Sequence, residues 1–286
     1  MKSIKYLVEF LLVKIFYMIF RILGLKVSSN ISGQIFLLYG LFSKRTKIAK
    51  SNIKRAFPDL TNKNIDYIVK RMWENFGRNI GEYPNLDRIK VHNNKDIQIK
   101  NIQNLLEPLK KSKNCLFFSA HIGNWELTSH PLTQNGYKIN FIYRAPNNKY
   151  VDGLLRKIRH SYGVNLIKKG KDGAKDCIKV LSKKGGNIGM LIDQKMNDGI
   201  ETNFFKRRVM TASAIAKFSL KFKCPIIPAF CIRKNKTSFV IKYMKPIPYQ
   251  KIKSLKNEEK IMNYLNKIIE RWIIDYPEQW IWFHNR

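Results

Sequence analysis

The sequence predicts an α/β fold in which a mixed, mostly parallel sheet is flanked by helices and preceded by a helical N-terminal part. Short apolar runs of strand length appear after residue 94, and segments with helical periodicity lie between the first four of them. The chain has 286 residues, of which 44% are hydrophobic and 12% aromatic. This composition can bury a sizeable core, so an intrinsically disordered protein is excluded.

The first expected element is a helix at the membrane. Residues 4–25 are mostly large apolar side chains, interrupted by the charges of Lys5, Glu9, Lys14 and Arg21. A clean membrane-spanning helix needs about 20 apolar residues with few charges. Because lysine and arginine can extend toward lipid headgroups, we expect residues 1–25 to form a helix embedded in or anchored to the membrane. A helix buried in a soluble core is the alternative.

Residues 26–286 are expected to form a single domain, divided into a helical part at 26–90 and an α/β core at 91–286. From residue 43 to about residue 90, apolar residues recur with helical spacing, with a break at residues 59–61. Thr61 or Asn62 is a plausible N-cap for the helix that follows the break.

The α/β core contains five predicted strands and several predicted helices. The strands are expected at 115–118, 139–143, 188–192, 225–230 and 239–243. Helical periodicity covers residues 153–162, 174–183 and 211–223, and a last helix is expected at about 257–276. Strands that alternate with helices of this length are typical of a sheet with helices packed on it.

The chain is strongly basic. It has 54 lysines and arginines against 20 acidic residues, which gives a net charge of +34. Such a surface favours anionic partners, namely nucleic acid, anionic lipid headgroups or phosphorylated substrates, although a base-composition bias of the coding genome is an alternative source of the lysines. Four cysteines occur singly, so neither a disulfide framework nor a zinc site is expected, and no metal or cofactor is predicted.

The sharpest motif in the sequence follows the strand predicted at 115–118. His121 lies where that strand gives way to a loop, which is where open α/β sheets bind ligands. Glu126 stands five residues further on, and Gly123 with Asn124 tolerate the turn that would bring the two side chains together. A carboxylate that holds an imidazole in one tautomer produces a general base for acyl transfer. A surface or structural His–Glu pair is the alternative.

The segment from His121 to Glu126 resembles the H-x-x-x-x-D/E motif of lysophospholipid acyltransferases. In detail it is similar to the lipid A biosynthesis acyltransferase family, the late acyltransferases that add a secondary acyl chain to a lipid A precursor. Further similar blocks lie at residues 52–60, 75–78, 143–163, 193–205 and 277–286, so the resemblance spans almost the whole chain. A glycine often follows the double phenylalanine in this family, whereas this chain has Lys206.

The resemblance implies a mechanism and a set of site residues. His121 would deprotonate the acceptor hydroxyl, Glu126 would orient His121, and the alkoxide would attack an acyl thioester without a covalent acyl-enzyme. Arg159 would be a charged donor near the site, with Arg144 and Arg156 as alternatives. Phe204 and Phe205 would line an acyl groove, and the tryptophans and His284 of the C-terminal block look like packing or interface positions. The expected substrate-binding residues are Arg144, Asn148, Arg156, Arg159, Asp193 and Gln194. Because Asp193 and Gln194 follow the strand predicted at 188–192, they are expected at the same edge of the sheet as His121.

The same resemblance implies the partners and the place of action. The acyl donor would be acyl carrier protein, the acceptor a phosphorylated glycolipid, and the enzyme would act at the inner membrane with its site facing the cytoplasm. An acyltransferase for another lipid acceptor, such as a glycolipid or lysophospholipid, is the alternative. A nucleic-acid-binding protein is disfavoured because the chain shows no zinc-finger spacing, RNA-recognition signature or concentrated basic helix. An inactive membrane-bound protein of the same fold is a third interpretation.

Overall fold

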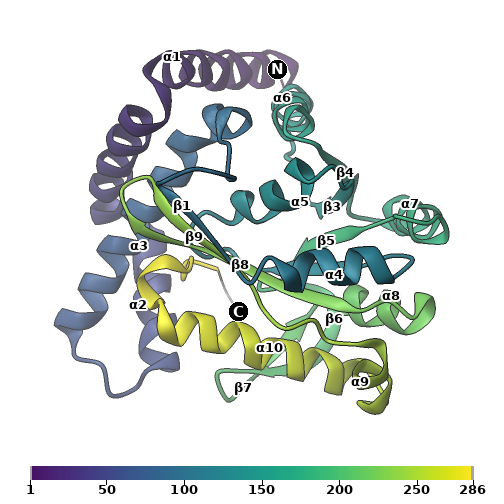
Figure 1. Ribbon diagram of the computed structural model, residues 1–286. Coiled ribbons are helices and arrows are strands. Elements are labelled where there is room, and N and C mark those ends of the chain that lie inside the picture. The colour runs from purple at the N-terminus through teal and green to yellow at the C-terminus, as the bar shows by residue number, and fades with distance from the viewer. Residues whose placement is uncertain (1, 285–286) are drawn as a thin grey trace.

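The structure, a computed structural model, describes residues 2–284. At its centre lies a seven-stranded sheet with the strand order β1-β9-β8-β2-β5-β3-β4 (Figure 1). Neighbouring strands are parallel except for β8 and β9, which pair antiparallel. The predicted mixed, mostly parallel sheet is therefore confirmed.

The five predicted strands are all present, and four further strands were not predicted. The strands are β1 (Ile97–Lys100), β2 (Leu116–Ser119), β3 (Ile139–Tyr143), β4 (Val164–Lys168), β5 (Ile188–Leu191), β6 (Lys195–Phe204), β7 (Arg207–Thr211), β8 (Ile226–Asn235) and β9 (Ser238–Tyr243). β1 and β4 are short strands at the two edges of the sheet, and β6 and β7 form a separate antiparallel hairpin rich in polar residues. None of these four contains the long apolar run that marks a buried strand.

Ten α-helices surround the sheet in the described part of the chain. They are α1 (Lys2–Phe42), α2 (Lys44–Ala56), α3 (Asn62–Glu82), α4 (Gln103–Lys111), α5 (His130–Gln134), α6 (Lys149–Ser161), α7 (Lys171–Ser182), α8 (Ala214–Phe222), α9 (Tyr249–Ser254) and α10 (Glu258–Asp275). Short 3-10 helices occupy η1 (Tyr83–Arg88), η2 (Trp125–Ser129) and η3 (Pro277–Gln279). The predicted cap is confirmed: the Thr61 hydroxyl accepts a hydrogen bond from the Asn64 amide.

The sheet divides the hydrophobic core into two layers, because successive residues of a strand point to opposite faces. In β2, Phe118 packs with Trp272 of α10 on one face. Phe117 belongs to the core on the other face, together with Leu86 of η1 and Leu105 of α4. Both faces of the central strands are thus buried, which is why these strands read as continuous apolar runs.

Helix α1 crosses the top of the view in Figure 1, bends at Gly24 and descends along the left side, where its second half packs on α3. Close packing of these helices depends on small residues. Ser28, Ser29 and Ser32 of α1 are buried, and a Cβ placed on Gly77 of α3 would lie 2.5 Å from the Ser32 carbonyl oxygen. Among residues 2–284, none of the helices combines the length and apolar composition needed to span a membrane.

Gly77→Ala should destabilise the protein by roughly 1–3 kcal/mol, because the added methyl group would meet backbone at the α1–α3 contact. Gly153→Ala in α6 is the matched control, since a Cβ there has no heavy atom within 4 Å. The control should be neutral or stabilising by up to about 1 kcal/mol. Urea unfolding curves of the two variants measure the difference, and equal midpoints would contradict the described packing.

Candidate active site

His121 and Asp193 lie side by side at one edge of the sheet. β2 and β5 are parallel neighbours in which Ser119 pairs with Leu191. His121 follows β2 and Asp193 follows β5, so the two side chains emerge at the carboxyl ends of adjacent strands. This is the edge at which open α/β sheets bind their ligands. The expectation that Asp193 and His121 share a sheet edge is confirmed.

Asp193 holds the His121 imidazole. The Asp193 side chain is fully buried, and its Oδ1 lies 2.8 Å from His121 Nδ1. Its Oδ2 accepts hydrogen bonds from the His121 backbone amide at 2.9 Å and from the Trp280 indole at 2.7 Å. Burial opposes ionisation of Asp193, but the facing imidazole and these hydrogen bonds hold its pKa well below the ordinary value. The carboxylate is therefore charged, with donors on both oxygens.

Gln194 links His121 to a second imidazole. Its Nε2 lies 3.4 Å from His121 Nε2, at the long end of the hydrogen-bond range, and 3.0 Å from His284 Nε2. An amide nitrogen only donates, so both imidazole nitrogens accept. His121 then carries its proton on Nδ1, toward Asp193, and keeps an unshared pair on Nε2. That tautomer is the one required of a general base.

The expected orientation of His121 by Glu126 is wrong in this structure. Glu126 accepts hydrogen bonds from Arg159 Nε at 3.1 Å, Arg159 Nη2 at 2.5 Å and the Tyr162 hydroxyl at 2.9 Å. Burial would raise the pKa of Glu126, but Arg159 and these hydrogen bonds lower it overall. The turn at Gly123 leads into η2, which points the Glu126 side chain to α6, whereas the imidazole faces the end of β5.

Glu126 and Arg159 border a mostly apolar hollow beside the sheet edge. Its space of about 410 Å³ includes open solvent, so it is a partly open hollow and not a closed cavity. Its wall consists of Trp125, Glu126, Ser129, Phe141, Ile142, Tyr143, Arg159, Val164, Leu166 and Leu191. The Trp125 ring connects this hollow to the His121 ring, with 5.0 Å between the centroids. An apolar chain in the hollow would thus end near the imidazole.

Comparison with known proteins gives a family for this arrangement. All residues, 1–286, match the family described as bacterial lipid A biosynthesis acyltransferase. The chain belongs to this family. It is also 23% identical over 247 residues to lipid A biosynthesis acyltransferase 2 of Shigella flexneri, a match that covers 85% of this chain and 77% of that protein. The protein is accordingly an acyltransferase of lipid A biosynthesis.

The remaining predicted site residues of the acyltransferase lie outside this cluster. Asn148 caps α6 by accepting from the Tyr150 amide, and its Nδ2 donates to the Tyr6 carbonyl oxygen of α1 at 2.7 Å. Its contacts therefore join α6 to α1. Arg144 and Arg156 are exposed, and Arg156 lies near the Tyr143 hydroxyl, which donates to Asp152.

Two residues beside the His121–Asp193 pair come from the C-terminal block, whose tryptophans and His284 were expected to be packing or interface positions. Trp280 donates to Asp193, and the His284 ring lies 6.2 Å from the His121 ring between centroids. Phe204, expected in the acyl groove, instead packs on Trp280 in the core, and Phe205 packs on Trp282 and Phe57. The signal that could have indicated Trp280 and His284 is the ring nitrogen that each carries within the apolar segment 280–284.

Residues 2–284 of the acyltransferase contain no cluster of three His, Cys, Asp or Glu side chains that could hold a metal ion. Each of the four cysteines is buried as a free thiol. Burial raises the pKa of Cys231 to about 12, so this thiol is protonated and unreactive at neutral pH.

The pH dependence of stability should report on His284. Burial lowers the pKa of His284 to about 4, with His121 and Arg45 acting in the same direction and Asp193 opposing. As the pH falls below about 6.5, the unfolded chain binds a proton that the folded chain refuses until about pH 4. Stability due to this group is therefore complete above pH 7 and is lost between about 6.5 and 4.

His284→Asn should remove that contribution, on the order of 2 kcal/mol between pH 7.5 and pH 4.5. Urea unfolding gives the free energy of unfolding of each protein at both pH values. The contribution is the amount by which the change between the two pH values is smaller in the variant than in the wild type. His160→Asn is the control, because His160 is exposed on α6. An identical pH dependence in all three proteins would show that His284 is not buried next to His121.

Proposed function

We propose that this acyltransferase moves a fatty acyl chain from the thioester of acyl carrier protein to a hydroxyl of a lipid A precursor, with His121 as the general base. The observation that carries the proposal is the His121 imidazole, fixed by Asp193 through Nδ1 and presenting Nε2 at the carboxyl end of the sheet. Membership of the lipid A biosynthesis acyltransferase family supports the reaction class.

The reaction needs no covalent intermediate with the enzyme. The acceptor hydroxyl lies against His121 Nε2, where Gln194 now donates, and gives its proton to that nitrogen as its oxygen attacks the thioester carbonyl. A C–O bond forms and the C–S bond breaks. The imidazolium, stabilised by the buried Asp193 carboxylate, then returns the proton to the departing thiolate of the carrier. Ester and free thiol are the products, and His121 is neutral again.

Arg159 is proposed as the charged group that faces the substrate. Its Nε and Nη2 atoms are held by Glu126, which fixes the plane of the guanidinium. Its Nη1 makes no hydrogen bond within the described part of the chain, so this atom remains to donate to a developing oxyanion or a phosphate. Glu126 thus acts on Arg159 and the site keeps two separate carboxylates, Asp193 for the base and Glu126 for the cation.

The adjoining hollow is proposed to take the acyl chain. Its side chains from β3, β4 and β5, Phe141, Leu166 and Leu191, are apolar, and Trp125 joins it to the imidazole. The thioester carbonyl at the mouth of the hollow would then lie between His121 and Arg159. A chain buried in this way removes apolar surface from water, at roughly 0.8 kcal/mol per CH₂ group.

His121→Ala should lower the transfer rate by on the order of 10²–10⁴-fold and leave the fold intact, because no other group can take the hydroxyl proton at that position. Purified protein is supplied with acyl carrier protein carrying chains of different length, and with a lipid A precursor or a lysophospholipid as acceptor. His160→Ala, on the exposed side of α6, is the control and should keep the wild-type rate. If the His121 variant kept the wild-type rate, the proposed mechanism would be wrong. If acyl chains were transferred only to the lysophospholipid, the proposed lipid A acceptor would be wrong.

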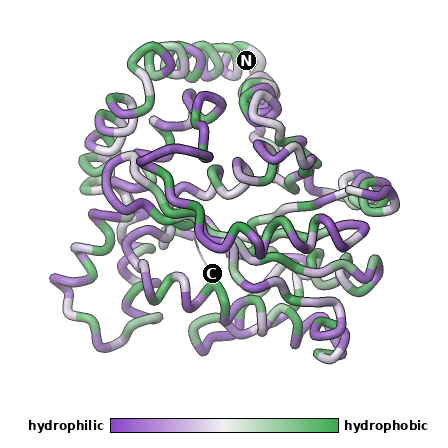
Figure 2. Tube along the Cα trace, in the orientation of Figure 1, coloured by the Kyte–Doolittle hydropathy of each residue, from purple (hydrophilic) through white to green (hydrophobic). Residues whose placement is uncertain are grey.

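Membrane binding through α1 is part of the proposal. Large apolar side chains are exposed on both sides of the Gly24 bend, among them Leu12 at 63%, Ile22 at 82% and Phe42 at 87%. Figure 2 shows hydrophobic residues along the whole of α1. Two of the charges that interrupt its first half turn toward the protein: Arg21 pairs with Asp87 of η1, and Glu9 accepts a hydrogen bond from Asn148.

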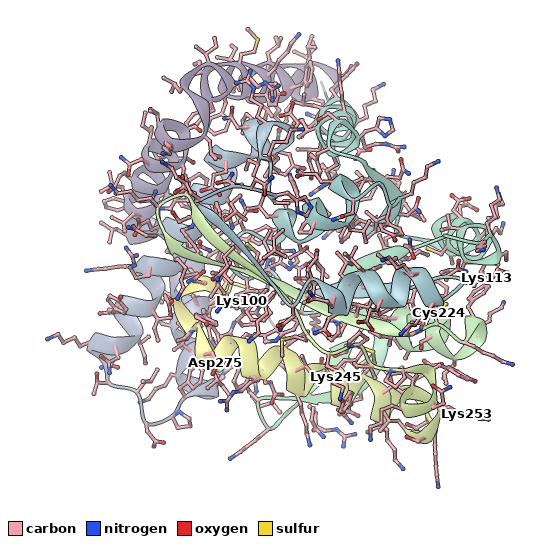
Figure 3. All side chains as sticks on the ribbon, viewed as in Figure 1. Lys100, Lys113, Cys224, Lys245, Lys253 and Asp275 are labelled. Carbon is pink, nitrogen blue, oxygen red and sulfur yellow. The ribbon has the colours of Figure 1, made fainter. Side chains whose placement is uncertain are left out.

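The basic surface suits anionic partners without being confined to α1. Lys113 and Lys253 lie on the right-hand side of the view in Figure 3, on the other side of the molecule from the descending half of α1, and both are exposed. A phosphorylated acceptor, an anionic membrane and an acidic carrier protein would all be attracted by such a surface. We place the site on the cytoplasmic side of the inner membrane, where acyl carrier protein is available.

The double variant Leu12→Glu, Ile22→Glu should weaken binding to vesicles of anionic phospholipid by at least tenfold, because both side chains would have to enter the interface as charges. Ile274→Glu is the matched control: Ile274 is 48% exposed on α10, and its substitution should not change vesicle binding. Co-sedimentation with vesicles measures both. Equal binding of the two variants would mean that α1 does not form the membrane surface.

A further inference from the structure

The turn between His121 and Glu126 is held from several sides. Gly123 has a φ of +56°, and a Cβ there would lie 1.9 Å from the Cys231 carbonyl oxygen, so only glycine fits. Its amide donates to the Gln279 carbonyl oxygen at 3.1 Å. The position of this turn therefore sets the backbone positions from which the His121 and Glu126 side chains extend.

Two asparagines of α3 hold the carbonyl oxygen of the turn. Asn75 Nδ2 donates to the Gly123 oxygen at 3.2 Å, and Asn79 Nδ2 donates to the same oxygen. Both asparagines are buried, at 6% and 5% exposure. An asparagine amide can present either its oxygen or its nitrogen, so something must fix which end faces Gly123.

Arg233 of β8 fixes both amides. Its Nε donates to Asn75 Oδ1 at 2.9 Å and its Nη2 donates to Asn79 Oδ1 at 2.7 Å. With their oxygens on the guanidinium, the two amides present only nitrogen donors to Gly123. A planar fork with several fixed donors can make both contacts at once.

Glu82 completes the arrangement from the end of α3. Its carboxylate is fully buried and pairs with Arg233 through both oxygens. The same carboxylate accepts from Asn124 Nδ2, in the turn itself, at 2.7 Å and from the Ser29 hydroxyl of α1 at 2.7 Å. Of the side-chain hydrogen bonds that this pair makes to other residues, three go to Asn75, Asn79 and Asn124. The other two go to the Ser29 hydroxyl and to the Lys236 carbonyl oxygen between β8 and β9.

We propose that Arg233 and Glu82 are positioning residues for acyl transfer, acting through Asn75, Asn79 and Asn124 to set the turn that carries His121. The inference rests on the proposed role of His121. A buried ion pair of this kind is weak evidence for stability, because the desolvation of two charges offsets their attraction. Three of its five side-chain hydrogen bonds to other residues instead go to the asparagines that hold, or belong to, the turn beside His121.

The chain contains a matched control on the same helix. Arg78 and Glu74 form a second buried pair on α3, with 9% exposure of each side chain, in which Arg78 Nε and Nη2 donate to Glu74 at 2.9 and 2.8 Å. Its contacts go to α1, through Ser29 and Asn30, and not to the turn. Removal of Arg233 leaves the buried Glu82 carboxylate without its cation, whereas Glu74 keeps Arg71 as a second partner when Arg78 is removed. Of the two arginines, only Arg233 reaches the asparagines that hold Gly123.

The experiment compares Arg233→Met with Arg78→Met in the full-length protein. Arg233→Met should lower kcat for acyl transfer by 10–100-fold with KM for acyl carrier protein changed less than threefold. Arg78→Met should keep kcat within about threefold, because the asparagines at the turn keep their guanidinium; urea unfolding of both variants gives the stability change against which each kcat is compared. Amide hydrogen exchange of the segment at residues 121–126 should accelerate in the first variant only. Acyl transfer by the wild-type protein tests the proposed function by itself, whereas the ratio of variant to wild-type kcat tests the positioning role.

Asn79→Leu provides a second test if Arg233→Met fails to fold, because it removes one donor to Gly123 and leaves the Arg233–Glu82 pair in place. It should lower kcat at least fivefold and accelerate exchange in the same segment. Arg233→Lys should recover stability without recovering kcat, since one ammonium group cannot hold both asparagine oxygens in the geometry of the fork. If kcat follows stability equally in the Arg233 and Arg78 variants, or exchange at 121–126 is unchanged, the positioning role is overturned.

Discussion

The site depends on one buried charge, the carboxylate of Asp193. A carboxylate without solvent is costly unless its oxygens are occupied by donors, and here the donors come from three places: the His121 ring, the His121 backbone amide and the Trp280 indole. Satisfying that charge brings the end of β2 and the C-terminal segment together over the carboxyl end of β5. The same carboxylate therefore holds the imidazole and the Trp280 side chain, while backbone hydrogen bonds between the C-terminal segment and residues 121–123 also close this edge.

The two acidic residues of the site have separate duties because their surroundings differ. Asp193 faces the His121 imidazole, and its Oδ1 lies 2.8 Å from the Nδ1 atom of that ring. Glu126 faces Arg159, a cation that keeps its charge. The two carboxylates thus hold different partners, the imidazole in one case and the guanidinium in the other.

Much of the fold could be predicted from the sequence, because buried parallel strands and amphipathic helices leave periodic patterns. The polar hairpin β6–β7 could not, since it lacks an apolar run. At the site, the shared edge of His121 and Asp193 followed from strand ends, but the pairing itself was assigned to Glu126 because that residue is close in sequence. Closeness in sequence was the wrong criterion for this pairing. The groups that surround His121 also include Trp280 and His284 of the C-terminal segment, and Arg233 of β8 acts on the turn beside it; a local motif shows none of these.

The hydrogen bond from Trp280 to Asp193 also has a consequence for the order in which the site forms during synthesis of the chain. More than half of the 286 residues separate His121 from Trp280, and the strand that carries Asp193 lies between them. A nascent chain that has already completed β5 still lacks the indole donor that satisfies the buried carboxylate. The arrangement around Asp193 is then completed in one late step, when the C-terminal segment reaches the end of β5.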